Sequence, residues 1–332
     1  MKKQVTIKDI AKLAGVSVAT VSRVINGNGR YSKDTEERVL RIIKEHNYSP
    51  NMLGKGLRTN KTNTIGIVVP DITNEFFARI IQEVEKNLFR AGYTTLVCNT
   101  SENPELEKRY LEVLNLNRVS GTIYIAGDTR VKHEEPRGIP AVYIDRWPST
   151  TRKDIVFIES DNFEGGRLAA QEMLKCGCRR IIFLTDERRT SAHQSRCEGY
   201  IRAHREFGVV PDERFIIGLS EISFDAAYNE VIRLIDNNVK FDGIFASTDW
   251  LALGSLVALE SRGIKVPEQV KIVGFDNISI SKHCSTPITT INQNVTQMGE
   301  LAVDLLLKLI DGKEIDKKYY VLPVELVKRS TT

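Results

Sequence analysis

The chain has 332 residues, 41% of them hydrophobic, which is enough to build two or three globular units with substantial cores. Its apolar runs, such as 65–69 and 181–184, are far shorter than the roughly 20 residues of a membrane-spanning helix, so no membrane partner is expected. Lys2 and Lys3 are followed by polar residues instead of an apolar signal core, and the five cysteines lack paired metal-ligand spacing. The composition predicts a cytoplasmic protein with reduced thiols, no metal and no cofactor.

The charge is distributed unevenly along the chain. Residues 1–61 contain 13 Lys or Arg against 5 Asp or Glu, a net charge of +8, and the remaining residues carry 34 against 38, a net charge of −4. A basic segment joined to a mildly acidic body favours a head that binds a polyanion and a body that binds something else.

The first elements expected in chain order are three short helices. Thr6 and Asp9 resemble a capping box, and apolar residues then repeat with helical spacing as far as Ala14. Ser17 is a good N-cap for a second helix, and Ser32 is a good N-cap for a third.

The spacing between the first two helices is typical of a helix-turn-helix. Ala11 is small enough for the helices to touch, Gly15 tolerates the positive φ of the turn, and Val21 can lock the second helix in place. The sequence therefore predicts an all-α helix-turn-helix domain over residues 1–49.

The start and the outer face of the second helix are the candidate reading surface for a major groove. Arg23 is the candidate for a bidentate guanine contact, whereas Val18 and Ala19 offer only apolar contact, for example to thymine methyl groups. The residues expected to contact DNA from this domain are Thr6, Ser17, Val18, Ala19, Thr20, Ser22, Arg23, Asn26 and Tyr31.

Three stretches of the sequence resemble the lactose repressor and galactose repressor (LacI/GalR) family. They read VTIKDIA at 5–11, GVSVATVSRVIN at 15–26 and NYSPN at 47–51, and the similarity continues to the C-terminus. The resemblance implies a sequence-specific DNA-binding regulator. It also implies a homodimer that binds a pseudo-palindromic operator in double-stranded DNA.

Residues 50–61 connect the head to the body. The resemblance implies a hinge helix that forms on operator DNA and pushes a leucine into the minor groove. The residues expected to contact DNA there are Asn51, Lys55 and Leu57. Gly54 and Gly56 depart from the family pattern, and each weakens a helix by about 1 kcal/mol relative to Ala. We therefore expect the hinge to be disordered without DNA.

From residue 62 onward short apolar runs alternate with amphipathic stretches, which predicts parallel sheets with right-handed crossovers and a cleft between two modules. The resemblance implies a periplasmic-binding-protein-like body. The expected fold is thus an all-α helix-turn-helix head plus an α/β body of two doubly wound parallel-sheet subdomains. The N-subdomain is expected at 62–161 and 292–318, and the C-subdomain at 162–291 and 319–332.

Ligands of doubly wound sheets bind beyond the carboxyl ends of the strands, and the residues that follow these strands are rich in carboxylates, amides and aromatic rings. Such a set suits a polyol or saccharide. The candidate effector-binding residues are Asn74, Phe76, Phe77, Asp145, Ser160, Arg196, Thr248, Asp249 and Asp276. Arg196 and Asp276 are the strongest candidates, whereas helix capping explains Asp249 equally well and core packing suits Phe77 better.

The function expected is repression of carbohydrate-utilisation genes, with operator affinity controlled by a small sugar or sugar phosphate. A purine, a nucleoside or a phosphoprotein co-effector remains an open alternative. An enzyme is disfavoured because the sequence has no GxxxxGK[ST] phosphate loop, GxSxG elbow or HExxH motif, and no catalytic residue is assigned. A transport-type sugar-binding protein is disfavoured by the basic head and the missing signal peptide.

Overall fold

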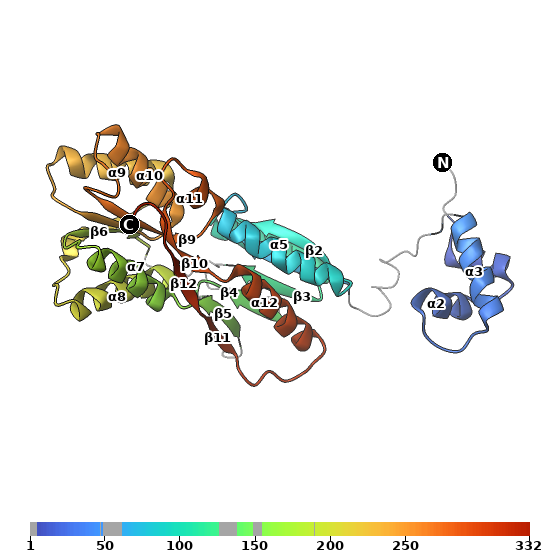
Figure 1. Ribbon diagram of the computed structural model, residues 1–332. Helices are drawn as coiled ribbons and strands as arrows, with labels where there is room; N and C mark the ends of the chain where they lie inside the picture. The colour runs from blue at the N-terminus through green and yellow to red at the C-terminus, as the bar shows by residue number, and fades with distance from the viewer. Residues whose placement is uncertain (1–4, 47, 49–61, 126–137, 149–154, 189) are drawn as a thin grey trace. The chain divides into compact units, whose positions relative to one another are not determined.

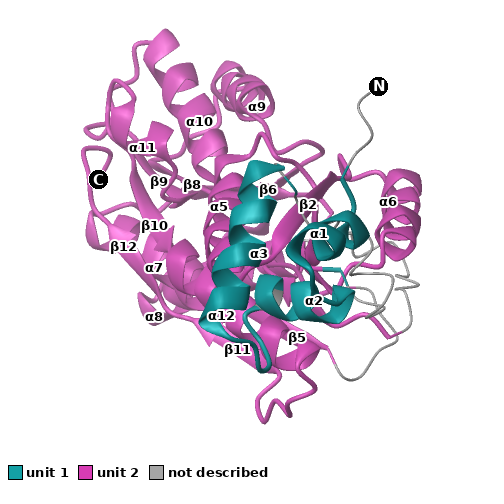
Figure 2. Ribbon diagram, turned by 90° about the vertical axis from the view of Figure 1, so that its right-hand side faces the viewer, with its two compact units in different colours: residues 1–62 teal, residues 63–332 magenta. Residues whose placement is uncertain are grey.

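The computed structural model describes residues 5–46, 48, 62–125, 138–148, 155–188 and 190–332 (Figure 1). The chain forms two compact units, residues 1–62 and residues 63–332 (Figure 2). Among the described residues the first unit is all-helical, and all the strands belong to the second.

The described part of the first unit consists of three helices, α1 (Ile7–Ala14), α2 (Val18–Asn26) and α3 (Lys33–Glu45). Each begins at its expected N-cap, Thr6, Ser17 or Ser32, whose side-chain oxygen accepts a hydrogen bond from a backbone N–H of the first turn. The predicted helices and their caps are confirmed.

The packing expected of a helix-turn-helix is also confirmed. Ala11 and Val21 are buried, and Gly15 ends α1 with a φ of +63°, a conformation that a side chain with a Cβ atom adopts only with strain. Ala11 and Val21 pack with Ile10 and Val39 in one small core, so the three helices hold one another in place.

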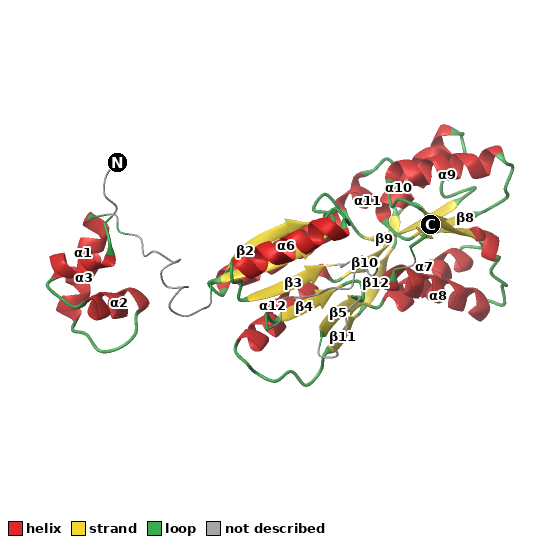
Figure 3. Ribbon diagram, turned by 180° about the vertical axis from the view of Figure 1, so that it is seen from behind, coloured by secondary structure: helices red, strands yellow, loops and turns green. Residues whose placement is uncertain are grey.

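The second unit contains two sheets of six strands each in its described part (Figure 3). The strands of the first are β1 (Thr64–Val69), β2 (Thr94–Asn99), β3 (Gly121–Ile125), β4 (Ala141–Ile144), β5 (Val156–Ser160) and β11 (Tyr319–Leu322). Those of the second are β6 (Ile181–Asp186), β7 (Ile216–Leu219), β8 (Gly243–Ala246), β9 (Lys271–Asp276), β10 (Thr289–Gln293) and β12 (Val324–Val327).

The strand orders are β11-β5-β4-β3-β1-β2 and β12-β10-β9-β8-β6-β7. The described pairs are parallel, except that β12 runs antiparallel to β10. Parallel strands bring their carboxyl ends to one edge of each sheet, which is where a ligand site is expected.

Helices cover both faces of each sheet. They are α5 (Glu75–Arg90), α6 (Pro104–Leu116), α7 (Asn162–Lys175), α8 (Ser191–Glu206), α9 (Phe224–Asp236), α10 (Asp249–Ser261), α11 (Ser279–His283) and α12 (Val295–Ile310), with a short 3-10 turn at Glu213–Phe215. Helices α5 and α12 pack on one face of the first sheet and α6 on the other, whereas α9 and α10 lie opposite α7 and α8 on the second. In the described part of the chain, no helix has both the length and the apolar character needed to span a bilayer.

The expected boundaries between the subdomains need two corrections. Residues 319–322, expected in the C-subdomain, form β11 and pair with β5 in the first sheet. The chain changes sheets only at Pro323, which lacks the N–H needed to continue the ladder. Strand β10 likewise keeps residues 292 and 293 in the second sheet. The chain therefore passes between the subdomains after β5, after β10 and after β11.

Candidate DNA-binding head and effector pocket

Helix α2 presents an exposed face that suits contact with a DNA groove. Val18, Ala19 and Arg23 are exposed on it, and Thr20 and Ser22 are partly exposed. Val18, at the first position of the helix, is 39% exposed. The face therefore combines a guanidinium with methyl-bearing side chains, the groups that read guanine edges and thymine methyls.

The side chain of Arg23 lies beside the turn that follows α2. A Cβ atom at Gly29, where φ is +91°, would come within 3.0 Å of Arg23 Cδ. Glycine at this position therefore leaves room for the arginine.

The other DNA-binding candidates occupy varied positions. Thr6 is exposed at the start of α1, Asn26 is the last residue of α2, and Tyr31 packs against the core of the head. The hinge candidates Asn51, Lys55 and Leu57, and with them the expected disorder of the hinge, lie outside the described residues.

A pocket of about 340 Å³ opens between the two subdomains, at the carboxyl ends of both sheets. Polar and aromatic residues line it, including Asp71, Asn74, Phe76, Phe77, Glu102, Asp145 and Arg146 from the first subdomain and Arg188, His193, Arg196, Ser220, Glu221, Thr248 and Asp276 from the second. Seven of the nine expected effector-binding residues are thus brought together, namely Asn74, Phe76, Phe77, Asp145, Arg196, Thr248 and Asp276.

The backbone is strained around this pocket. Seven non-glycine residues of the described chain have a positive φ, and five of them lie at or just after the ends of strands that reach the cleft, namely Ser101, Glu102, Asp145, Asp276 and Asn277. Each such residue costs on the order of 1 kcal/mol and persists where the surroundings enforce it, typically at functional sites. The strain marks the same edge of the sheets as the pocket does.

Arg196 is buried and lines the pocket together with the buried residues Asp145 and Asp276. We call these three residues the pocket floor. Arg196 donates through Nε to Asn162 Oδ1 at 2.9 Å and through Nη1 to the carbonyl of Ser247 at 2.6 Å, while its guanidinium stacks 3.6 Å above the ring of Phe275. Arg196 Nη2 lies 4.0 Å from Asp276 Oδ1. Burial lowers the pKa of Arg196, and Asp276 and Asp145 oppose that shift.

Two glycines bring α8 close enough to α7 to hold Arg196 in this position. A Cβ atom at Gly166 would lie 2.1 Å from the carbonyl oxygen of Arg196, and one at Gly199 would lie 2.0 Å from that of Phe163. Neither distance is compatible with a side chain, so glycine is required at both crossings.

Two buried carboxyl groups lie near Arg196, Asp145 from the first subdomain and Asp276 from the second. Asp276 accepts a hydrogen bond from Gln293 Nε2 at 2.7 Å, and burial raises its pKa to about 8 against the opposing effect of Arg196. Burial also raises the pKa of Asp145, whose Oδ1 has no hydrogen-bond partner within the described structure. Both carboxyls therefore have acceptor or donor capacity for a polar ligand.

Aromatic rings form the wall that the first subdomain contributes. Asn74 caps α5 by accepting from Phe76 N at 3.0 Å, which starts the helix at the pocket. The rings of Phe76 and Phe77 lie 5.4 Å apart, and both residues belong to the core while lining the cavity. Phe77 therefore both packs in the core and lines the pocket, the two roles considered for it from the sequence.

Asp249 does not line the cavity. Its Oδ2 accepts from Ile278 N at 2.8 Å and its Oδ1 from Thr290 Oγ1 at 2.5 Å, so both oxygens tie α10 to the neighbouring strand ends. The cap of α10 is Thr248, which does line the pocket. In this arrangement Asp249 holds neighbouring elements together, and its contact with an effector stays a prediction.

Ser160 also lies away from the lining. It is buried at the end of β5, where its carbonyl accepts from Asn162 Nδ2 at 3.1 Å. Its position at a strand end is correct, but the strand ends at a crossover between the subdomains instead of at the cavity wall.

Comparison with known proteins assigns the family. Residues 6–51 match the family model of bacterial regulatory proteins of the lacI family, and residues 170–332 match the model of a periplasmic binding protein-like domain. The ribose operon repressor of Halalkalibacterium halodurans is 36% identical over 98% of this chain and 97% of its own length. The chain belongs to the LacI family.

The LacI-family chain is therefore a DNA-binding transcriptional regulator with a body that takes a small-molecule effector. A PurR transcriptional repressor of Vibrio atlanticus is 34% identical over 98% of both chains. The expected family and function class are confirmed.

Solved structures of LacI-family proteins have the same architecture. The lac repressor dimer bound to operator and an anti-inducer is 25% identical over 99% of both chains, with a TM-score of 0.85. A LacI-family regulator of Enterococcus faecium with bound ribose is 30% identical, covers 81% of this chain and 98% of its own, and has a TM-score of 0.72. The expected fold class is confirmed.

Several lining residues of this LacI-family pocket were missed from the sequence. Glu102 lies in the loop after β2 and Glu221 in the loop after β7, at the strand-end positions where ligands of doubly wound sheets bind. His193 donates to or accepts from Thr185 Oγ1 through Nδ1 at 3.2 Å. Burial, then Arg196, lowers its pKa well below the usual value, so its imidazole is neutral. Arg188, at the mouth, follows a strand-end aspartate by two residues.

Proposed function

We propose that this regulator represses carbohydrate-utilisation genes and that an uncharged sugar of monosaccharide size, bound between the subdomains, controls its affinity for operator DNA. The single observation that carries the proposal is the pocket floor, where Asp145, Arg196 and Asp276 converge in a cavity that Phe76 also lines. Carboxylate and guanidinium groups hydrogen-bond the hydroxyls of a sugar, and an aromatic ring packs on its C–H face. The relative that represses a ribose operon and the neighbour with bound ribose support this class of effector.

The charge of the pocket favours a neutral sugar over a sugar phosphate. The lining contains Asp71, Glu102, Asp145, Glu221 and Asp276 against Arg146, Arg188 and Arg196. Each of the three guanidiniums lies within 4.0 Å of a carboxylate. A phosphate would have to displace one of these carboxylates, whereas hydroxyl groups can bind alongside them.

A purine is the second candidate, because PurR repressors are among the relatives at 34% identity over nearly the whole chain. The paired rings of Phe76 and Phe77 also suit a flat base. The floor favours the sugar, since the guanidinium of Arg196 and the carboxyl groups of Asp145 and Asp276 converge there and can hydrogen-bond several hydroxyl groups.

We further propose that two copies of the chain bind one pseudo-palindromic operator in the cytoplasm, and that the chain acts as a regulator without enzymatic activity. The neighbouring lac repressor binds its operator as a dimer, which supports this arrangement. In the head, Arg23 and Val18 would read bases, with Thr6, Ser17, Ala19, Thr20, Ser22, Asn26 and Tyr31 around them. Asn51, Lys55 and Leu57 remain our candidates for hinge contacts in the minor groove.

The test is a binding screen on the full-length protein. A duplex is first selected from a random-sequence pool, and its affinity is then measured with D-ribose, D-xylulose, D-glucose, cellobiose, ribose 5-phosphate, hypoxanthine and guanine. We expect one neutral monosaccharide to bind and to change the DNA affinity, and ribose 5-phosphate to do neither. A response confined to the purine bases would replace the sugar proposal with the second candidate, and the absence of any preferred duplex would overturn the regulatory role.

A further inference from the structure

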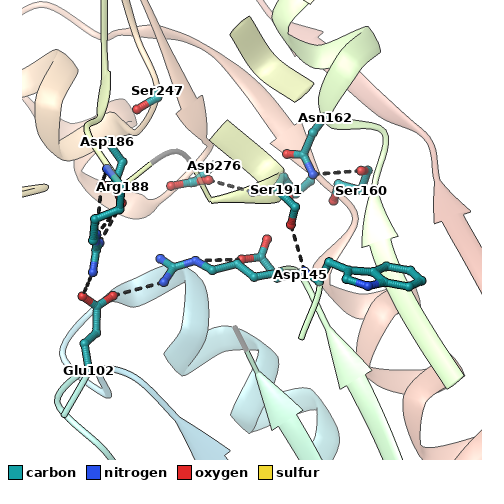
Figure 4. A network of polar contacts seen from close by, with 12 residues as sticks. Glu102, Asp145, Ser160, Asn162, Asp186, Arg188, Ser191, Ser247 and Asp276 are labelled. Carbon is teal, nitrogen blue, oxygen red and sulfur yellow. Dashed lines mark hydrogen bonds and ion pairs between the residues drawn. The ribbon is translucent and has the colours of Figure 1, made fainter. Parts of the chain in front are cut away.

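A continuous chain of ion pairs among residues that line or adjoin the pocket joins the two subdomains, and Figure 4 shows its link between Glu102 and Arg188. Glu102, from the first subdomain, accepts from Arg146 Nη1 through Oε1 at 3.1 Å. Its other oxygen, Oε2, pairs with Nη1 of Arg188 from the second subdomain. We call the Glu102–Arg188 pair the interlobe bridge.

Both ends of the interlobe bridge are held in place. Arg188 donates through Nε and Nη2 to the buried carboxylate of Asp186, at 2.9, 3.0 and 2.7 Å. Ser101 and Glu102 are two successive residues with left-handed φ angles of 49° and 53°, so the loop after β2 has a strained conformation as it presents the carboxylate. Arg146 completes the support by lying over the ring of Phe77 at 5.8 Å.

The interlobe bridge lies at the entrance, above a floor that is almost entirely buried. Asp145, Arg196 and Asp276 are at most 5% exposed, whereas the side chains of Glu102 and Arg188 keep 31% and 23% of their surface in solvent. All five residues line the same cavity of about 340 Å³, which is at the small end of the range of ligand sites. Glu102 and Arg188 therefore lie nearer the solvent than the floor does, on one side of a cavity that remains partly open.

Glu102 is suited to this pairing because it is charged. Burial acts to raise its pKa, but Arg188 and Arg146 outweigh that effect and hold the pKa below its usual value. The pair joins loops that follow β2 and β6, which belong to different sheets, so it can form only when the subdomains approach each other.

We propose that the interlobe bridge is a gate that determines the size of the effector, because it closes over a monosaccharide and excludes sugars with a substituent that projects through the mouth. Glu102 and Arg188 are then specificity-determining residues that act by closing the site and not by reading the sugar. The inference rests on the proposed function, since it concerns the sugar held in the same pocket.

The test compares the wild type with Glu102→Ala, Arg188→Ala and the double variant, all in the full-length protein. The matched control is Asp212→Asn, which breaks a 2.6 Å ion pair with Arg214 that joins neighbouring residues within one subdomain. The probes are D-ribose, D-glucose, their methyl β-glycosides and cellobiose, measured by calorimetry and stopped-flow dissociation.

We expect the bound monosaccharide to dissociate about fivefold faster from each variant, as for the loss of a partly exposed ion pair. The affinity for the methyl glycoside relative to the free sugar should rise by about tenfold, because the gate no longer excludes the added group. The double variant should resemble the single ones, since both remove the same pair. Asp212→Asn should match the wild type in every ratio.

The outcomes separate the gate from the proposed function. If wild type binds a monosaccharide and the glycoside ratio is unchanged in Glu102→Ala, the gate is overturned and the sugar site stands. If no sugar binds the wild type or any variant, the proposed function and the size gate both fail.

A measurement without ligand tests the interlobe bridge itself. Amide exchange in segments 100–103 and 186–188 should be faster in Glu102→Gln than in the wild type, and unchanged in Asp212→Asn. Equal exchange in all three proteins would overturn the bridge as a contact that holds the subdomains together.

Discussion

Arg196 connects more of the pocket floor than any single carboxylate there. It contacts Asn162, Ser247 and Phe275, and it is the buried cation between Asp145 and Asp276. The stability of a buried charge depends on the opposite charges around it, because burial removes most of its hydration. The residue therefore supports the structure and the ligand site at the same time.

Arg196→Met should abolish binding of the monosaccharide and lower the free energy of unfolding by about 3 kcal/mol, because two buried carboxyls lose their cation. Urea unfolding and calorimetry measure the two effects. Arg202→Met is the control on the same helix, since its side chain is 61% exposed. Unaltered sugar affinity in Arg196→Met would remove this residue from the site.

Asp276 makes the stability of the body depend on pH. Its folded pKa is about 8, whereas an unfolded aspartate has a pKa of about 3.9. Between these values the folded state holds a proton that the unfolded state has released, so a rise in pH favours unfolding. The stabilisation is complete below the unfolded pKa and is lost as pH rises through the folded one.

Asp276→Asn should therefore flatten the fall in unfolding free energy between pH 5 and 8, by up to about 1.4 kcal/mol per pH unit. Urea titrations followed by circular dichroism at four pH values provide the measurement. Asp304→Asn, on the exposed side of α12, is the control. A variant slope equal to that of wild type would contradict protonation of Asp276 in the folded state.

In the head, Arg23→Ala should reduce the preference for the selected duplex over random DNA, by about 1–3 kcal/mol for the loss of one bidentate base contact. Arg38→Ala on α3, where Arg38 pairs with Asp34, should leave that ratio unchanged. Competition binding at constant salt measures both. Equal losses on both kinds of DNA would make Arg23 a phosphate contact.

At the scale of elements, the crossing of α7 and α8 controls the position of Arg196. Gly166→Ala would place a Cβ atom 2.1 Å from the backbone oxygen of Arg196, so the helices must separate. We expect a loss of about 2 kcal/mol in stability and at least a partial loss of sugar affinity. Lys175→Ala, at the exposed end of α7, is the control. Full sugar affinity of Gly166→Ala in calorimetry would refute the role of this crossing in positioning Arg196.

Local signals in the sequence were sufficient for the head and for most of the body. Thr6, Ser17 and Ser32 predicted the helix starts because capping is a local interaction. The strand-end rule found Asp145 and Asp276 but also Asp249, since all three follow apolar runs. Only tertiary packing distinguishes an aspartate that faces the cavity from one tied to Ile278 and Thr290.

The end of the chain and the mouth of the pocket were harder to predict. Residues 319–327 form one extended stretch, and only Pro323 indicates that it belongs to two sheets. Glu102 and Arg188 are 86 residues apart and meet through the approach of two subdomains. Neither residue has a sequence pattern of its own that specifies this contact.

At the scale of the whole molecule, effector and DNA must influence each other reciprocally. If the sugar changes the DNA affinity by some factor, the selected duplex must change the sugar affinity by the same factor. Titrating each ligand in the presence and absence of the other should give one closed thermodynamic cycle. A cycle that does not close would mean that a further state or a second site takes part.

The threefold passage of the chain between the sheets limits how this protein can be recombined with its relatives. A chimera with a single junction anywhere in the body would combine segments of both parent proteins within the same subdomain. Exchange of a complete subdomain requires three junctions, near Asp161, Asn294 and Pro323. A chimera built at those three positions would transfer one wall of the pocket, with its half of the bridge, as an intact folding unit.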